Sequence, residues 1–146
     1  LSPSSSSSLS SISSSAFSNP SLYRCLVGRL QYLAITRPDL AFAVNQVCQH
    51  KQSPSQDDFA KVKRLLRYVH GTLHHGLHFS PSSFDIHAFS DADWAGNPCD
   101  RRSTSSFCLN LGSNMVSWIV KKLPTVARSS TEAEYRSMAQ AAVEVS

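Results

Sequence analysis

The spacing of apolar residues changes near residue 76, and this change limits the folds that the chain can adopt. Before that point, Leu22, Leu26 and Leu30 recur at the interval of an α-helix. After it, Phe84 and Ile86 alternate with polar neighbours, as residues do along a strand with one buried face. The sequence therefore predicts an α/β chain in which a helical segment precedes a strand-rich one.

Residues 20–76 predict three helices. The first ends where Arg37 is followed by Pro38, because proline disfavours helical backbone in the residue before it. A second helix is expected around residues 40–50. A third is expected to start after Ser55, which can cap its N-terminus, while Asp57 and Asp58 in the first turn would stabilise the helix dipole.

Residues 77–146 predict a β-β-β-α unit. The strands are expected at residues 84–90, 103–111 and 115–120, with a hairpin turn around Gly112, and residues 77–79 could add a short strand. Serines 129 and 130 and Thr131 offer N-caps for a helix over residues 132–145.

Both ends of the chain stand apart from this pattern. Twelve of the first twenty residues are serine, so we expect residues 1–19 to be a disordered leader that buries too little apolar area to fold. The chain starts at Leu1 and stops at Ser146 inside a helical pattern, which suggests a piece cut from a longer protein. We find no apolar run long enough to cross a bilayer.

Acidic residues near a strand end and a helix start could carry chemistry. Asp91 and Asp93 lie where a strand is expected to end, and Glu134 lies near the start of the last helix. Such elements can meet at one edge of a sheet, where carboxylates suit Mg²⁺. Two structural explanations compete: an aspartate after a strand often belongs to a turn, and Thr131 with Glu134 fits a capping box.

Basic residues and histidines suggest further sites. Lys121, Lys122 and Arg128 flank the approach to Glu134 and could bind phosphate groups, or they could simply belong to a solvated loop. The net charge of +4 is compatible with a polyanionic partner. Four histidines, at positions 70, 74, 75 and 78, permit a zinc hypothesis but lack a second ligand pair at suitable spacing.

Seven segments in collinear order resemble one known family, the Pol polyproteins of copia-type LTR retrotransposons. The segments are SLYRCLVG at 21–28, TRPDLAFAV at 36–44, VKRLLRYVHGT at 62–72, FSDADWAG at 89–96, DRRSTS at 100–105, SW at 117–118 and SSTEAEY at 129–135. Residues 20–76 resemble the thumb or connection segment of the reverse transcriptase. Residues 77–146 resemble the first part of the ribonuclease H domain.

The resemblance implies a ribonuclease H-like mixed sheet and cleavage of the RNA strand of RNA–DNA hybrids with two Mg²⁺ or Mn²⁺ ions. By motif position, Asp91 would be the first metal ligand and Glu134 the second. The implied partners are an RNA–DNA hybrid and the rest of the polyprotein, with no membrane. The implied location is intracellular, in a cytoplasmic particle or the nucleus.

The chain also departs from the family pattern. The third catalytic aspartate of the family belongs to a later strand that this sequence lacks, so we expect residues 1–146 to be inactive alone. Two other interpretations remain open. The chain could be a non-catalytic nucleic-acid-binding piece that also uses the basic helix with Lys61, Lys63, Arg64 and Arg67, or an inert remnant of a retroelement.

Overall fold

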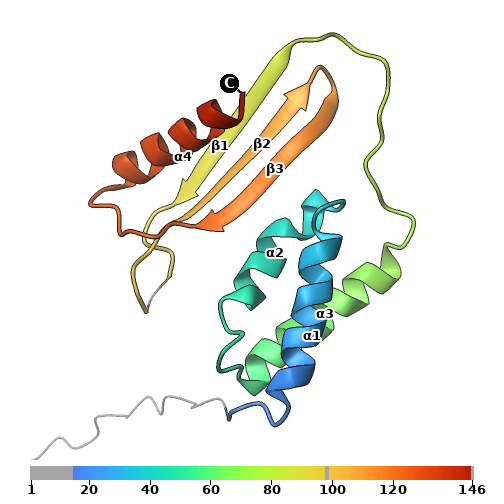
Figure 1. The fold of residues 1–146 in the computed structure, drawn as a ribbon, viewed down its shortest axis with the longest axis vertical. Coiled ribbons are helices and arrows are strands. Elements are labelled where there is room, and N and C mark those ends of the chain that lie inside the picture. The colour runs from blue at the N-terminus through green and yellow to red at the C-terminus, as the bar shows by residue number, and fades with distance from the viewer. Residues whose placement is uncertain (1–14, 98, 146) are drawn as a thin grey trace, which may run out of the picture.

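The computed structural model describes residues 15–97 and 99–145 and shows a group of helices followed by a sheet with one more helix (Figure 1). In chain order the elements are α1 (Pro20–Leu33), α2 (Pro38–Cys48), α3 (Gln56–Gly71), β1 (Ile86–Asp93), β2 (Thr104–Leu111), β3 (Asn114–Lys122) and α4 (Ser130–Val145). The α/β class and the β-β-β-α order of the second half are thus confirmed.

Local signals in the sequence set the starts of the first three helices. The Asn19 side chain accepts a hydrogen bond from the backbone of Leu22 and caps α1. Pro38 begins α2, where its missing N–H costs nothing. At α3, Ser55 and Asp58 form a reciprocal capping box, in which each side chain bonds the other residue's backbone N–H.

The three helices share one core of buried apolar side chains, which are Tyr23, Val27, Leu30, Leu40, Val44, Val47, Val62 and Leu65. Each helix contributes residues at a spacing of three or four. In α1 the buried residues are Tyr23, Val27 and Leu30, whereas Leu22 of the expected apolar face is exposed and Leu26 is only partly buried. The buried Tyr23 hydroxyl donates to the Val47 carbonyl at 2.8 Å, so the one polar group on that side chain is satisfied.

Arg37 ties the start of α2 to the end of α3. Its buried guanidinium donates to both carboxylate oxygens of Asp39 and also to the carbonyl and hydroxyl oxygens of Thr72. The Tyr68 hydroxyl donates to the same Asp39 carboxylate at 3.0 Å. The hydrogen bond from Arg37 holds the pKa of Asp39 below its usual value. Two separate motifs, at 36–44 and 62–72, therefore interlock.

The three strands form an antiparallel sheet in the order β1-β2-β3. Gly112, with φ of +56°, makes the tight turn between β2 and β3. Every pairing in the described sheet is antiparallel, so the parallel strand that would make it a mixed sheet is not among residues 15–97 and 99–145.

The short strand expected at residues 77–79 was wrong. Residues 75–85 have no regular secondary structure, and the expected domain boundary at residue 76 falls in this connecting segment. Side-chain contacts replace a strand ladder here, because the Asn114 amide bonds both the N–H and the carbonyl of Ser80. Pro81 also lacks the N–H that a strand position would use.

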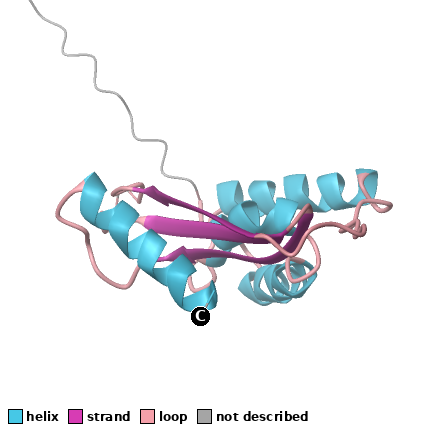
Figure 2. Ribbon diagram, turned by 90° about the horizontal axis from the view of Figure 1, so that it is seen from above, coloured by secondary structure: helices cyan, strands magenta, loops and turns pink. Residues whose placement is uncertain are grey.

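The sheet is covered differently on its two faces. Helix α4 packs along β1 and β2, whereas the three-helix group lies apart from α4 and meets the sheet mainly where α2 contacts β3 (Figure 2). The Trp118 indole donates to the Ala34 carbonyl at 3.0 Å, and the Asn45 amide donates to the Val120 carbonyl at 3.0 Å. These bonds fix the helices to the sheet.

Part of the expected disordered leader is ordered. Phe17 stacks on Phe59 with ring centroids 4.1 Å apart, and its N–H donates to the Pro54 carbonyl. The prediction of disorder therefore extended too far, because Phe17 supplies the apolar contact that the serines lack. Residues 1–14, which make up the rest of the leader, lie outside the described part of the chain.

Candidate functional site: two carboxylates on β1 and α4

A buried hydroxyl joins the strand that carries Asp91 to the helix that carries Glu134. The Ser137 Oγ of α4 donates to the Asp91 carbonyl oxygen at 2.8 Å and lies 3.2 Å from the Ser106 carbonyl oxygen. Glu134 precedes Ser137 by three residues, so the two lie on neighbouring positions of the helix surface. The structure thus brings the two predicted elements into contact.

The side chain of Asp91 leaves β1 on the side away from α4. The Ser105 side chain points to α4, where it bonds Ser137, and Ser105 pairs in register with Ala92. Since neighbouring strand residues face opposite ways, Asp91 faces the other side. There it lines a groove of about 270 Å³ beside Pro38 of α2. A cation bound by both carboxylates would therefore lie at the outer edge of β1.

Asp91 is a strand residue and not a turn residue, which removes one of the structural explanations for it. Asp91 lies within β1 and pairs in register with Ser106 of β2, and β1 continues to Asp93. The Asp93 carboxylate lies so close to Gly96 that a β-carbon there would be 1.8 Å from its Oδ2. A larger residue at position 96 would therefore force the exposed Asp93 side chain to move.

Glu134 does not cap α4, so the second structural explanation is also wrong. The Ser129 hydroxyl accepts from the Glu132 N–H at 3.1 Å, and the Glu132 carboxylate accepts from the Arg128 N–H at 2.7 Å. Since Glu132 performs the capping role, Glu134 is left exposed on the second turn of the helix.

The donor set at this place suits a hard cation but is small. Within residues 15–97 and 99–145, neither the Asp91 nor the Glu134 carboxylate has a hydrogen bond or ion pair to another side chain or to the backbone. No three His, Cys, Asp or Glu side chains of the described residues gather as a metal site. Two carboxylates with water can hold one Mg²⁺, so the residue types fit the ion while the number of ligands is low.

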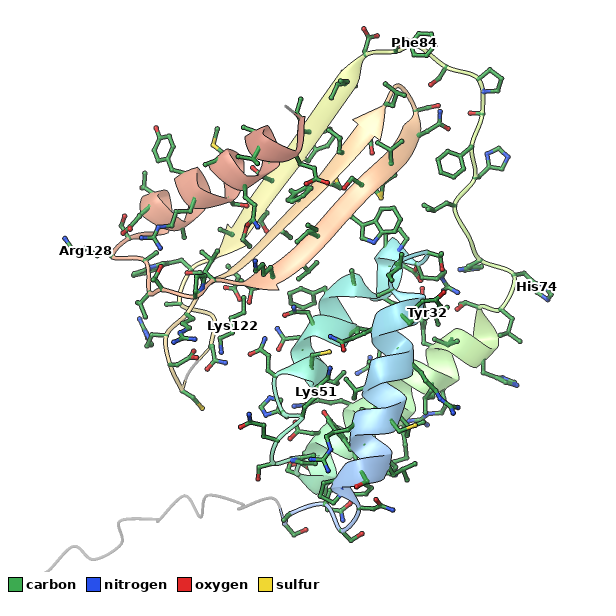
Figure 3. All side chains as sticks on the ribbon, in the orientation of Figure 1. Tyr32, Lys51, His74, Phe84, Lys122 and Arg128 are labelled. Carbon is green, nitrogen blue, oxygen red and sulfur yellow. The ribbon has the colours of Figure 1, made fainter. Side chains whose placement is uncertain are left out.

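The three basic residues predicted for nucleic-acid binding do not form one patch. The Lys122 ammonium is ion-paired to Asp100 at 2.9 Å and donates to the Gln49 side chain at 3.2 Å. In Figure 3, Lys122 lies at the base of the sheet near the helices, whereas Arg128 projects outward before α4. Lys121 pairs in register with Ser105 and so faces α4.

The histidines are exposed and are not assembled into a site among the residues that the structure describes. His70 lies in the last turn of α3, and the other three histidines lie in the segment that follows this helix. Within the described ranges, they do not belong to any group of three His, Cys, Asp or Glu side chains that could hold a metal ion.

Two serines buried under α4 were missed by reasoning from the sequence. Ser105 is 1% exposed, and Ser137 is fully buried. In a sequence, serine inside a helix or strand usually indicates a solvated position. The spacing of Ser137 from the alanines at 133 and 141 was the one available signal, since residues four apart share a helix face.

Comparison with known proteins links the chain to retroelements. It is 51% identical over 137 residues to an uncharacterized mitochondrial protein of Arabidopsis thaliana, a match that covers 93% of the chain and 57% of that protein. It is 48% identical over 128 residues to the retrovirus-related Pol polyprotein from transposon RE2 of the same plant, covering 87% of the chain and 9% of the polyprotein.

A third relative is named as an effector protein and not as a Pol polyprotein. The chain is 43% identical over 124 residues to the secreted RxLR effector protein 161 of Plasmopara viticola, which covers 84% of the chain and 87% of that protein. No family model matches the chain, and no solved structure matches it. In the described residues, no helix has the length and apolar character needed to span a membrane.

The α/β architecture and these likenesses place the chain among sequences of retroelement type. More narrowly, it belongs to the family of copia-type retrotransposon Pol polyproteins, as the ordered motifs suggested. The match covers 57% of the length of the mitochondrial protein and 9% of the length of the RE2 polyprotein.

Proposed function

We propose that this chain is a segment of a reverse transcriptase–ribonuclease H polyprotein whose intact form hydrolyses the RNA strand of RNA–DNA hybrids. Residues 20–76 would belong to the thumb or connection part of the reverse transcriptase. Residues 77–146 would begin a ribonuclease H-like domain. The observation that carries the proposal is the Ser137 Oγ to Asp91 carbonyl bond of 2.8 Å, because it holds the helix of Glu134 against the strand of Asp91.

In this proposal Asp91 and Glu134 would hold Mg²⁺ or Mn²⁺ at the outer edge of β1. Bound divalent ions supply an activated water and stabilise the leaving oxygen of the phosphodiester. The two exposed carboxylates provide the oxygen ligands, and Lys121 or Arg128 could bind the phosphates of the hybrid. Lys122 would contribute only if it left Asp100.

The described residues alone provide too few ligands for the two-ion reaction, which shares carboxylates between ions about 4 Å apart. We therefore expect residues 1–146 to leave a labelled hybrid uncut in Mg²⁺ or Mn²⁺. Activity would require a further carboxylate from the rest of the polyprotein. In the cell, that polyprotein would act in a cytoplasmic particle or in the nucleus.

The direct test places residues 20–146 in the full Pol polyprotein from transposon RE2, in exchange for the matching segment, and measures cleavage of a labelled hybrid. Asp91→Asn and Glu134→Gln should each abolish cleavage. Glu132→Gln is the matched control on the same helix, since Glu132 caps α4, and cleavage should persist. Equal activity in Asp91→Asn and the unmodified chimera would refute the proposal, as would an inactive chimera that folds like its parent.

A second candidate function is nucleic-acid binding without catalysis through α3. Lys61 is occupied by Asp58 at 3.0 Å, but Arg64 and Arg67 are exposed on the same helix, and Lys63 lies over the Phe59 ring. Binding of a hybrid that weakens with salt and is lost on replacing Arg64 and Arg67 would favour this function. A chain that neither binds nor cleaves would be an inert remnant.

A further inference from the structure

Ser137 occupies the point where α4 touches β1, and we infer that it is a positioning residue for the carboxylate pair. Its hydroxyl fixes the helix of Glu134 against the strand of Asp91, and so sets the separation of the two carboxylates. This inference rests on the proposed function, because the pair matters only if both carboxylates bind the same ion.

The contacts of Ser137 are directional and shielded from water. Its side chain is fully buried, and its Oγ accepts the Ser105 hydroxyl at 2.8 Å. Its single hydroxyl hydrogen is left for the carbonyl oxygens of Asp91 at 2.8 Å and Ser106 at 3.2 Å. One hydroxyl therefore joins the helix to both β1 and β2.

The residues around Ser137 allow the close approach of helix and sheet but do not fix its position. Ala133 and Ala141, one turn to either side, are buried at 0% and 5% exposure. Methyl groups pack without directional preference, so these contacts favour close approach without a hydrogen-bonded register. The hydroxyl of Ser137 gives the interface a single favoured register, because displacement leaves buried polar groups unpaired.

The register matters because metal ligation tolerates little error. One residue of helix slide moves a side chain by about 1.5 Å. Carboxylate oxygens must lie within about 0.2 Å of the ideal distance to a Mg²⁺ ion. Glu134 is three residues from Ser137 on the same helix. A displacement of α4 that moves the Ser137 hydroxyl therefore also moves the Glu134 carboxylate.

Two substitutions separate positioning from general packing. Ser137→Ala removes the bond to the Asp91 carbonyl while keeping the helix on the sheet. Ser105→Ala is the matched control, because it removes one buried hydroxyl of the same cluster but leaves the Ser137 bond to Asp91. If Ser137→Ala does not fold, Ser137→Cys replaces it, since a thiol has similar volume and is a weak donor.

The test uses residues 1–146 and two measurements. Residual dipolar couplings of the backbone report the orientation of α4 on the sheet without metal. Mn²⁺ titration, followed by the broadening of amide signals near Asp91 and Glu134, reports binding by the pair. We expect Ser137→Ala to change the α4 couplings and to weaken Mn²⁺ binding about tenfold. Ser105→Ala should keep the orientation and change binding less than about threefold.

The outcomes distinguish this inference from the proposed function. If Mn²⁺ broadens the amide signals of Asp91→Asn as strongly as those of the wild type, the metal site and the proposed function fail. The inference that rests on them then fails as well. If wild-type binding depends on both carboxylates but Ser137→Ala binds like wild type with unchanged α4 couplings, only the positioning role is overturned. Equal effects of Ser105→Ala and Ser137→Ala would also overturn it.

Discussion

The capping box of α3 contains a nearly buried carboxylate whose removal should destabilise the helical group. Asp58 is 4% exposed, and its carboxylate accepts from the Ser55 N–H at 3.1 Å, the Ser55 hydroxyl at 2.7 Å and the Lys61 ammonium at 3.0 Å. Burial alone would raise the pKa of Asp58, but the two Ser55 bonds and Lys61 outweigh it and hold the pKa below the usual value.

The size of the effect follows from these bonds. Hydrogen bonds to a charged group contribute about 1.5 to 3 kcal/mol each. The Lys61 pair is more exposed and adds about 0.3 to 0.5 kcal/mol, whereas desolvation of the carboxylate removes part of the sum. We expect Asp58→Asn to lower the free energy of unfolding by about 2 to 3 kcal/mol at neutral pH.

The effect should disappear in acid. Because the folded-state pKa of Asp58 is lowered, its contribution is present above the unfolded-state pKa of about 4 and is lost as the pH falls through the folded-state value. Urea unfolding followed by circular dichroism at pH 7 and pH 3 measures both limits. Asp57→Asn, in the same first turn but exposed, is the control. If both variants lose equal stability at pH 7, the reasoning fails.

Three further substitutions test the core and the contact between the layers. Burial raises the pKa of Tyr23 to about 12, so the free energy of unfolding should fall as the pH rises from about 10 to 12. Tyr23→Phe should remove this alkaline loss of stability. In an ultraviolet titration the variant should also lack the ionisation near pH 12. Leu40→Ala should lower the free energy of unfolding by about 2 to 5 kcal/mol through the cavity it leaves, measured by urea unfolding. Trp118→Phe leaves the Ala34 carbonyl without its donor and should cost about 1 to 2 kcal/mol in the same assay.

The apolar spacing of the sequence was enough to predict the three helices and three strands, because helices and strands repeat with different periods. It overestimated burial in β1, which is exposed along almost its whole length. It was not enough for the start of α4. The sequence Ser129 to Glu134 contains two overlapping matches to a capping box, one ending at Glu132 and one at Glu134. Only the folded chain shows that the first match forms, with Ser129 as the cap.

The connection before β1 and the buried serines show a second limit. A short apolar run such as 77–79 has the composition of a strand, but a strand needs a partner edge, and here the Asn114 side chain satisfies Ser80 instead. Only its spacing from Ala133 and Ala141 hints at the burial of Ser137, because packing between distant elements decides it. Register and burial across the chain are tertiary properties that local patterns do not contain.

The carboxylates that lie in the family motifs of this chain fall into two groups according to their contacts. Asp39 lies in a network with Arg37, so Asp39→Asn should lower the melting temperature. The carboxylates of Asp91 and Glu134 have no such partner among the residues that the structure describes, and an exposed charge without a partner contributes little to folding. Asp91→Asn and Glu134→Gln should therefore leave the melting temperature unchanged in thermal unfolding. A clear loss in either would show that the carboxylate stabilises the fold, and would weaken the case that it is held for a ligand.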